Sequence, residues 1–220
     1  MGRKGLSQEQ IINAFLFSAF EKSAGSTSLQ DIAASLGIKK ASLYNHFTSK
    51  EDMYFASVDY CRIYLDSISF IAEEDSKGDK IYLMEPKAAF RKVFKRYVQI
   101  YESEPVFQIY SFVNSEKYFC AKAAKIFDSE FFKVKSGILE LLRGFEKAGA
   151  FTLPENELLR NLAGNFTLSL MQQLDSYIVN KKELVRQNPE CGVGSLFALP
   201  TDEESLENIY SLADFYLGLL

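Results

Sequence analysis

The sequence has no tryptophan, a single histidine and only three cysteines among its 220 residues. The cysteines, Cys61, Cys120 and Cys191, lie far apart, without the short paired spacing of a zinc site or a thiol redox pair. The sequence also contains no glycine-rich nucleotide loop, no metal-ligand cluster and no nucleophile–base pair. We therefore expect no enzyme activity, no metal and no cofactor, and we expect the cysteines to be reduced and structural.

Long apolar runs are also missing. No stretch of 18 apolar residues occurs, and the first ten residues lead into an amphipathic segment, so neither a membrane-spanning helix nor a secretory signal is supported. Hydrophobic residues nevertheless make up 47% of the chain and aromatic residues 14%, which excludes a disordered or collagen-like chain. We expect a globular cytoplasmic protein with no membrane partner.

Apolar residues recur at steps of three and four along most of the chain, and no stretch alternates long enough to predict a strand. The sequence predicts an all-α fold with about nine or ten helices. Polar or Gly/Pro-rich loops are predicted at 73–80 and 188–200. The predicted helices span residues 7–22, 28–36, 39–47, 50–73, 86–103, 105–114, a long segment ending at 147, 155–182 and 202–220.

Positive charge gathers at one place in a chain whose net charge is -4. Three lysines and the only histidine fall within residues 39–50. Two short predicted helices meet here at Gly37 and follow a supporting helix, which is typical of a helix-turn-helix whose second helix enters the major groove. The lysines suit phosphates, and the polar side chains between them can address bases. A solvated charged face on a helical protein that binds no DNA is the alternative at this point.

The segment DIAASLGIKKASLYNHFTSKEDM, residues 31–53, closely resembles the TetR family of transcriptional regulators. The resemblance lies in the Ile-Ala pair, the Gly-hydrophobic turn, the Leu-Tyr-x-His-Phe run and the following Ser-Lys-Glu. It implies an N-terminal helix-turn-helix DNA-binding domain at 1–53 and a helical effector-binding and dimerisation domain at 54–220.

The resemblance also assigns candidate DNA contacts. Tyr44, His46 and Lys50 would bind the DNA backbone, and the amino end of the helix that starts near residue 50 would point at a phosphate. The residues expected to face the groove are Lys39, Lys40, Ala41, Ser42 and Asn45. Thr27 and Ser28, at the start of the second helix, complete the set. Arg3 and Lys4 are either a minor-groove arm or a solvated tail.

Two local departures from the family pattern carry expectations of their own. The turn at 23–26 is one residue shorter than usual. Lys39 stands where the recognition helix usually has a capping Ser or Thr, so we expect that helix to begin without this cap.

A single recognition helix reads few base pairs, so we expect a homodimer on a pseudo-palindromic operator. The resemblance places dimerisation in the last two long helices, at 155–182 and 202–220. The sequence leaves open which of their apolar residues form the core and which form the interface.

Aromatic residues of the second domain are candidates for an effector pocket, with plain core packing as the alternative. The candidates are Tyr64, Phe94, Tyr97, Tyr101, Tyr110, Phe131, Phe166 and Gln173. The predicted function is a repressor released from its operator by a small apolar or aromatic ligand. The alternative is a DNA-binding regulator without a small-molecule effector, which is controlled by a protein partner or acts as an activator.

Overall fold

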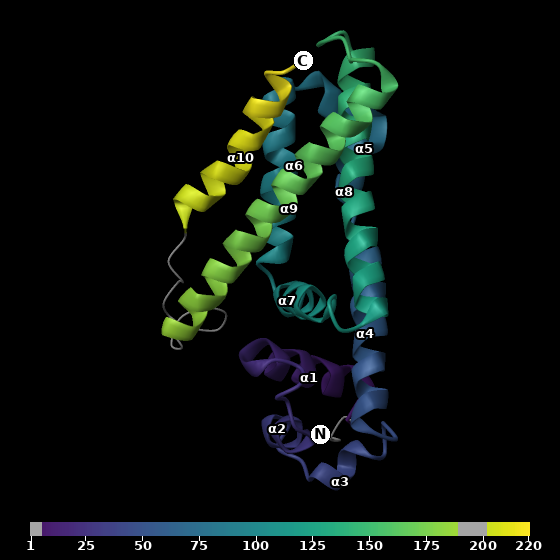
Figure 1. Cartoon of the computed structure of the whole chain (residues 1–220), viewed down its shortest axis with the longest axis vertical. Coiled ribbons are helices and arrows are strands. Elements are labelled where there is room, and N and C mark those ends of the chain that lie inside the picture. The colour runs from purple at the N-terminus through teal and green to yellow at the C-terminus, as the bar shows by residue number, and fades with distance from the viewer. Residues whose placement is uncertain (1–5, 189–201) are drawn as a thin grey trace. The chain divides into compact units, whose positions relative to one another are not determined.

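The computed structural model describes residues 6–188 and 202–220, and in this part of the chain it contains ten α-helices, one 3-10 helix and no strand. The predicted all-α fold is confirmed. The α-helices, labelled in Figure 1, are α1 (Gln8–Lys22), α2 (Leu29–Ser35), α3 (Lys40–Leu43), α4 (Lys50–Asp66), α5 (Glu73–Ser76), α6 (Pro86–Tyr101), α7 (Val106–Glu116), α8 (Ala121–Lys147), α9 (Asn156–Gln187) and α10 (Glu203–Leu217). The 3-10 helix η1 (Lys77–Leu83) follows α5.

The described chain divides into two compact units. The first takes in residues up to Ile68 together with Ser103–Ser129, and the second takes in Ser69–Glu102 and the chain from Glu130 onward. The first unit therefore holds the three short N-terminal helices together with α4, α7 and the start of α8. The sequence-based division after residue 53 falls inside α4.

In the first unit, α1 lies against α2, α4 and α7. Ser7 caps α1 in a capping box with Gln10. Phe15 is fully buried and packs edge-on against Phe112 of α7 at 5.8 Å between ring centroids, while Phe20 packs against Phe107 at 4.8 Å. These rings fix the helix that supports α2 and α3.

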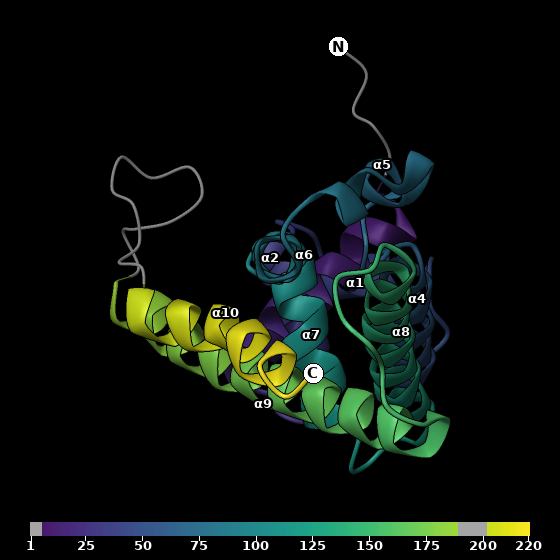
Figure 2. The ribbon, with the colours of Figure 1, turned by 90° about the horizontal axis from the view of Figure 1, so that it is seen from above.

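In the second unit, α10 lies against both α6 and α9, and Figure 2 shows α9 and α10 running side by side. The core is aromatic. Phe166 of α9 is stacked between Phe90 of α6 and Tyr216 of α10, with ring centroids 5.7 and 4.3 Å away, and Phe94 meets it edge-on. Rings from three helices thus close over one another.

The connection between α4 and α6 differs from the prediction. The fourth helix ends at Asp66 instead of near residue 73, and the predicted polar loop at 73–80 is occupied by α5 and most of η1. The segment packs onto α8 at two glycines seven residues apart. A Cβ on Gly137 would lie 2.4 Å from the Phe70 ring, and one on Gly144 would lie 2.0 Å from the Tyr82 ring. The apolar periodicity of a single segment cannot predict such packing, because it joins residues that lie far apart in the sequence.

Two of the three cysteines, Cys61 and Cys120, are free and buried, and burial raises the pKa of the Cys61 thiol. Cys191, the loop predicted at 188–200 (apart from residue 188), and the arm residues Arg3 and Lys4 lie outside the described residues. None of the helices in the described residues is both long and apolar enough to cross a membrane.

Candidate DNA-binding surface

The turn between α2 and α3 is set by a glycine in the left-handed region. Gly37 has φ of 64°, and its N–H donates to the Ala34 carbonyl at 3.1 Å. The Ile38 N–H donates to the Ala33 carbonyl at 2.9 Å, which completes a Schellman motif. Because a side chain at Gly37 would strain this φ, the glycine fixes the direction in which the chain enters α3.

The helix α3 is shorter than the predicted 39–47 segment. It spans Lys40–Leu43 and then tightens, because the N–H groups of Tyr44, Asn45 and His46 each donate to the carbonyl three residues earlier. Lys39 makes no side-chain cap, which confirms the expectation from its type. The recognition segment is therefore one α-helical turn followed by a 3-10-like turn.

Two buried anchors hold this segment against the first unit. Leu43 and Phe47 are buried, four residues apart, whereas the polar side chains between and before them are exposed or half-buried. Tyr44 keeps 51% of its surface exposed, although it is a large ring. The candidate contact residues that are exposed are Lys39, Lys40, Ala41, Tyr44, Asn45 and Ser28, and Ser42, His46 and Lys50 are half-buried.

Thr27 lies differently from its neighbour Ser28. Only 1% of Thr27 is exposed, and its hydroxyl donates to the Ser23 carbonyl at 2.8 Å. Ser28 is exposed and caps α2 in a capping box with Asp31. Thr27 is thus occupied with closing the α1–α2 turn and offers no polar atom to a partner.

Two long-range hydrogen bonds position the recognition segment. Gln8 of α1 donates its Nε2 to the His46 carbonyl at 3.0 Å, across 38 residues of sequence. Lys50 donates its Nζ to the Gly25 carbonyl at 3.3 Å. The sequence analysis missed Gln8, since a side chain that contacts a distant backbone carbonyl leaves no periodic signal.

The amino end of α4 is already capped from within. The Ser49 hydroxyl accepts the Asp52 N–H at 2.9 Å, and the Asp52 carboxylate accepts both the N–H and the hydroxyl of Thr48, at 2.9 and 3.0 Å. Asp52 and Glu51 place negative charge in the first turn.

Charge on this surface is positive from α2 to the start of α4. No acidic residue occurs from 32 to 50, while three lysines do. The nearest upstream carboxylate, Asp31, is neutralised by Lys22, whose Nζ lies 2.6 Å from it, and this contact and the Ser28 hydrogen bonds hold the pKa of Asp31 well below its usual range.

The candidate effector residues are divided between the two units. Tyr64 and Tyr110 belong to the first unit, and the other six belong to the second. Phe94, Tyr97, Tyr101 and Phe166 are buried and pack mostly against other rings. At one edge of this cluster the buried Glu130 accepts hydrogen bonds from Tyr97 and Tyr101 and pairs with Lys133. Burial is the main reason that the pKa of Tyr101 lies well above its ordinary value.

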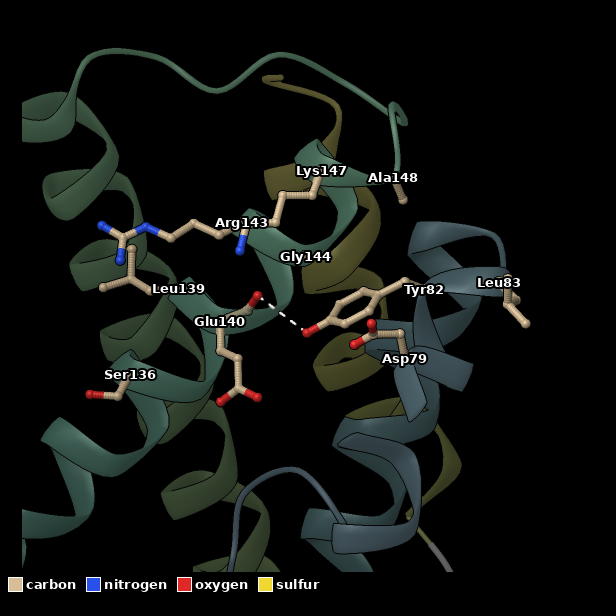
Figure 3. A pocket seen from close by; sticks show the side chains of 10 residues that line it. All are labelled: Asp79, Tyr82, Leu83, Ser136, Leu139, Glu140, Arg143, Gly144, Lys147 and Ala148. Atoms are coloured by element: carbon tan, nitrogen blue, oxygen red, sulfur yellow. Dashed lines mark hydrogen bonds between the residues drawn. The ribbon is translucent and has the colours of Figure 1, made fainter. Parts of the chain in front are cut away.

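A cavity of about 680 Å³ in the second unit lies elsewhere, between η1 and the end of α8. Figure 3 shows Tyr82 beside Gly144, with its hydroxyl donating to the Glu140 carbonyl at 3.4 Å. The side chains of Arg143 and Lys147 lie along the same cavity. None of the eight candidate effector residues lines it. Within the described residues there is also no cluster of three or more potential metal ligands.

Residues 16–56 match the family described as "Bacterial regulatory proteins, tetR family". The "Biofilm operon icaADBC HTH-type negative transcriptional regulator IcaR" of Staphylococcus aureus (strain NCTC 8325 / PS 47) is 36% identical over 99 residues, which is 43% of this chain and 51% of that one. IcaR of Staphylococcus epidermidis is 34% identical over 95 residues, with the same shares. The chain spans about half the length of these curated relatives.

Solved structures match along nearly the whole chain. A transcriptional regulator from Rhodococcus sp. Rha1 has a TM-score of 0.62 at 14% identity, and a TetR transcription regulator from Haloarcula marismortui has 0.59 at 18%; each match covers 97% of both chains. At these identities the likeness shows the fold alone.

Proposed function

We propose that this chain, whose residues 16–56 match the TetR family of regulatory proteins, is a transcriptional repressor of that family and binds operator DNA through α3 and the turn after it. The observation that carries the proposal is the placement of side chains along residues 39–47. Leu43 and Phe47 are buried, and the lysines and polar side chains around them are turned outward. A helix held by two apolar anchors can enter a major groove without losing its packing.

The proposed contacts fall into two groups. Tyr44, His46 and Lys50 bind phosphates and fix the register. The second group faces base edges and consists of Lys39, Lys40, Ala41, Ser42 and Asn45, with Ser28 beside it. Thr27 is left out of this set because its hydroxyl is buried and already bonded.

Repression is the proposed direction of control. The curated relatives carry the name of a negative transcriptional regulator, and the family match at residues 16–56 contains the helix-turn-helix. Activation, or control by a protein partner without a small-molecule effector, is the alternative. Because genomic DNA is the proposed target, we assign the protein to the cytoplasm.

A homodimer is proposed because a single α3 covers only a few base pairs. In the second unit, α9 and α10 each retain exposed apolar side chains in addition to their buried faces. These are Leu158, Leu168 and Val179 on α9 and Phe215 on α10, with Leu219 just beyond it. Sedimentation at micromolar concentration tests this, and a monomer would contradict it.

The effector is proposed to be a small apolar or aromatic molecule that binds in the second unit. The aromatic cluster around Phe166, with Glu130 as its polar edge, supplies apolar contact and a hydrogen-bonding group. A ligand there would lower operator affinity by the coupling free energy, typically about 1 to 3 kcal/mol. A thermal-shift screen of metabolites tests this; uniform silence favours the alternative.

Gel-shift titration on operators selected from random DNA tests the central proposal. Tyr44→Ala is expected to weaken binding to every selected site by roughly tenfold, since it removes a phosphate contact and little packing. Tyr118→Ala is the matched control, because Tyr118 is also exposed, lies in the same unit and sits in the turn before α8. Equal affinities of Tyr44→Ala and Tyr118→Ala would refute the assignment of α3.

A further inference from the structure

A second cavity, of about 600 Å³, lies within the first unit among α1, the end of α2 and the start of α7. The α1 side of its wall is formed by Gln10, Asn13, Ala14 and Phe17, which share one helical face because they are three and four residues apart. The cavity has the size of an ordinary small-molecule site. It contains none of the proposed DNA contacts.

Two carboxamide oxygens beside this cavity are unsatisfied. Asn13 Oδ1 and Gln108 Oε1 are buried and have no hydrogen-bond partner among the described residues, and Gln108 is only 6% exposed. Gln108 donates its Nε2 to Glu104 Oε1 at 3.0 Å. Since a carboxylate only accepts, this bond requires the amide nitrogen to face Glu104 and leaves the oxygen as the unmatched end.

A buried acceptor without a partner costs free energy, and a bound hydrogen-bond donor would remove that cost. The terminal torsion of a glutamine side chain is soft, so a small rotation of Gln108 would present its oxygen to a donor in the cavity. Both unpaired atoms, Asn13 Oδ1 and Gln108 Oε1, are acceptors. A ligand that satisfies them must therefore carry a hydrogen-bond donor.

The charge of the residues that line the cavity indicates which kind of donor would bind there. Glu104 is the one charged residue among the described residues that line the cavity. Leu16, Phe17, Leu36 and Pro105 supply apolar surface, and the ring of Phe17 remains half-exposed. A carboxylate and an aromatic face without a competing cation favour a positively charged donor.

We propose that this cavity binds an organic cation, with a primary ammonium group on a small apolar or aromatic body. The ammonium group donates to the Glu104 carboxylate and to the carboxamide oxygens of Gln108 and Asn13, while the apolar body lies on Phe17, Leu36 and Pro105. The site is separate from the effector proposed for the second unit and does not depend on DNA binding.

The test is direct binding of phenethylammonium to the full chain without DNA, measured by calorimetry and by ligand-observed NMR. The neutral analogue 2-phenylethanol has a similar shape and one donor. The cation is expected to bind about tenfold more tightly than the alcohol, since hydrogen bonds to charged groups are stronger. Glu104→Gln should abolish this difference, whereas Glu21→Gln, an exposed glutamate of α1 outside the cavity, should keep it.

A second variant separates the cavity from a general effect of charge. Gln108→Leu removes the unmatched oxygen, so it is expected to fold, as circular dichroism can check, and to weaken cation binding at least about fivefold. Gln30→Leu, on the exposed face of α2, is its control. The proposal is overturned if phenethylammonium shows no saturable binding below roughly 10 mM, or if 2-phenylethanol binds as tightly as the cation. It is also overturned if Glu104→Gln and Gln108→Leu both bind the cation as tightly as the wild type.

Discussion

Tyrosine is exposed in the recognition segment of the first unit and buried in the aromatic core of the second unit. Tyr44 lies between Leu43 and Phe47, which are four residues apart, and stays half-exposed, while Tyr97 and Tyr101, also four residues apart, are buried on α6. Around Tyr44 only Leu43 and Phe47 are apolar anchors. Around Tyr97 and Tyr101, rings from neighbouring elements complete the packing.

This difference in exposure shows that the spacing of aromatic residues along a helix does not by itself tell a core ring from a contact ring. A ring becomes core when other helices bring apolar surface to it, and it becomes a contact residue when its neighbours are polar and no element covers it. Helical spacing is the same in both cases. Four predictions test this contrast.

Removing a ring from the second unit should have the largest effect. Phe166→Ala is expected to lower the free energy of unfolding by about 3 to 5 kcal/mol, because the ring is fully buried among Phe90, Phe94 and Tyr216. Urea titration followed by circular dichroism measures it. Phe132→Ala is the control, because Phe132 lies on α8 in the same unit and is exposed. A loss below about 1 kcal/mol for Phe166→Ala would contradict the close packing of this ring.

The second largest effect is expected at Gly144, which leaves room for the ring of Tyr82. Gly144→Ala is expected to destabilise the chain by about 1 to 3 kcal/mol, because the new methyl group would lie 2.0 Å from the ring. In a Tyr82→Ala background the same change should be neutral or stabilising, since alanine favours a helix. A thermal-melting double-mutant cycle measures the coupling. Additive effects would contradict the packing of η1 on α8.

Changing a lysine of the DNA-binding surface should affect binding far more than stability. Lys50→Ala is expected to reduce the slope of log affinity against log salt by about one, since Lys50 is one of the proposed phosphate contacts and each neutralised phosphate releases counterions. Fluorescence anisotropy at several salt concentrations measures this slope. Lys125→Ala, an exposed lysine of α8 in the same unit, should leave it unchanged. A uniform loss for both lysines would indicate that net charge alone matters.

The smallest effect is expected from the carboxylate at the start of α2. The pKa of Asp31 is lowered in the folded state by Lys22 and Ser28, so its stabilisation is present above the ordinary value near 4 and is lost as the pH falls toward the folded value. The melting temperature of Asp31→Asn should therefore lie below that of the wild type at about pH 7, and the gap should shrink at about pH 2. Asp128→Asn, exposed on α8, should show no such narrowing.

Adjacent residues mark the limit of prediction at the DNA surface. Thr27 and Ser28 are both small hydroxyl residues before α2, and the pattern assigns the same role to both. The fold buries one and exposes the other, because Thr27 turns toward the Ser23 carbonyl while Ser28 caps the helix. The contact of Gln8 with the His46 carbonyl is equally absent from any local pattern.

The sequence by itself determined the all-helical class, the turn at Gly37 and the set of polar residues on and just after α3. Each of these depends on residues within one or two helical turns of each other, where backbone geometry alone decides the outcome. Only the tertiary structure decided that residues 69–85 pack on two glycines of α8, that the candidate pocket rings close on one another, and that Gln108 keeps an unmatched oxygen beside a cavity. Those features join segments far apart in the chain, and their energy comes from shape and hydrogen-bond matching between surfaces that no local pattern specifies.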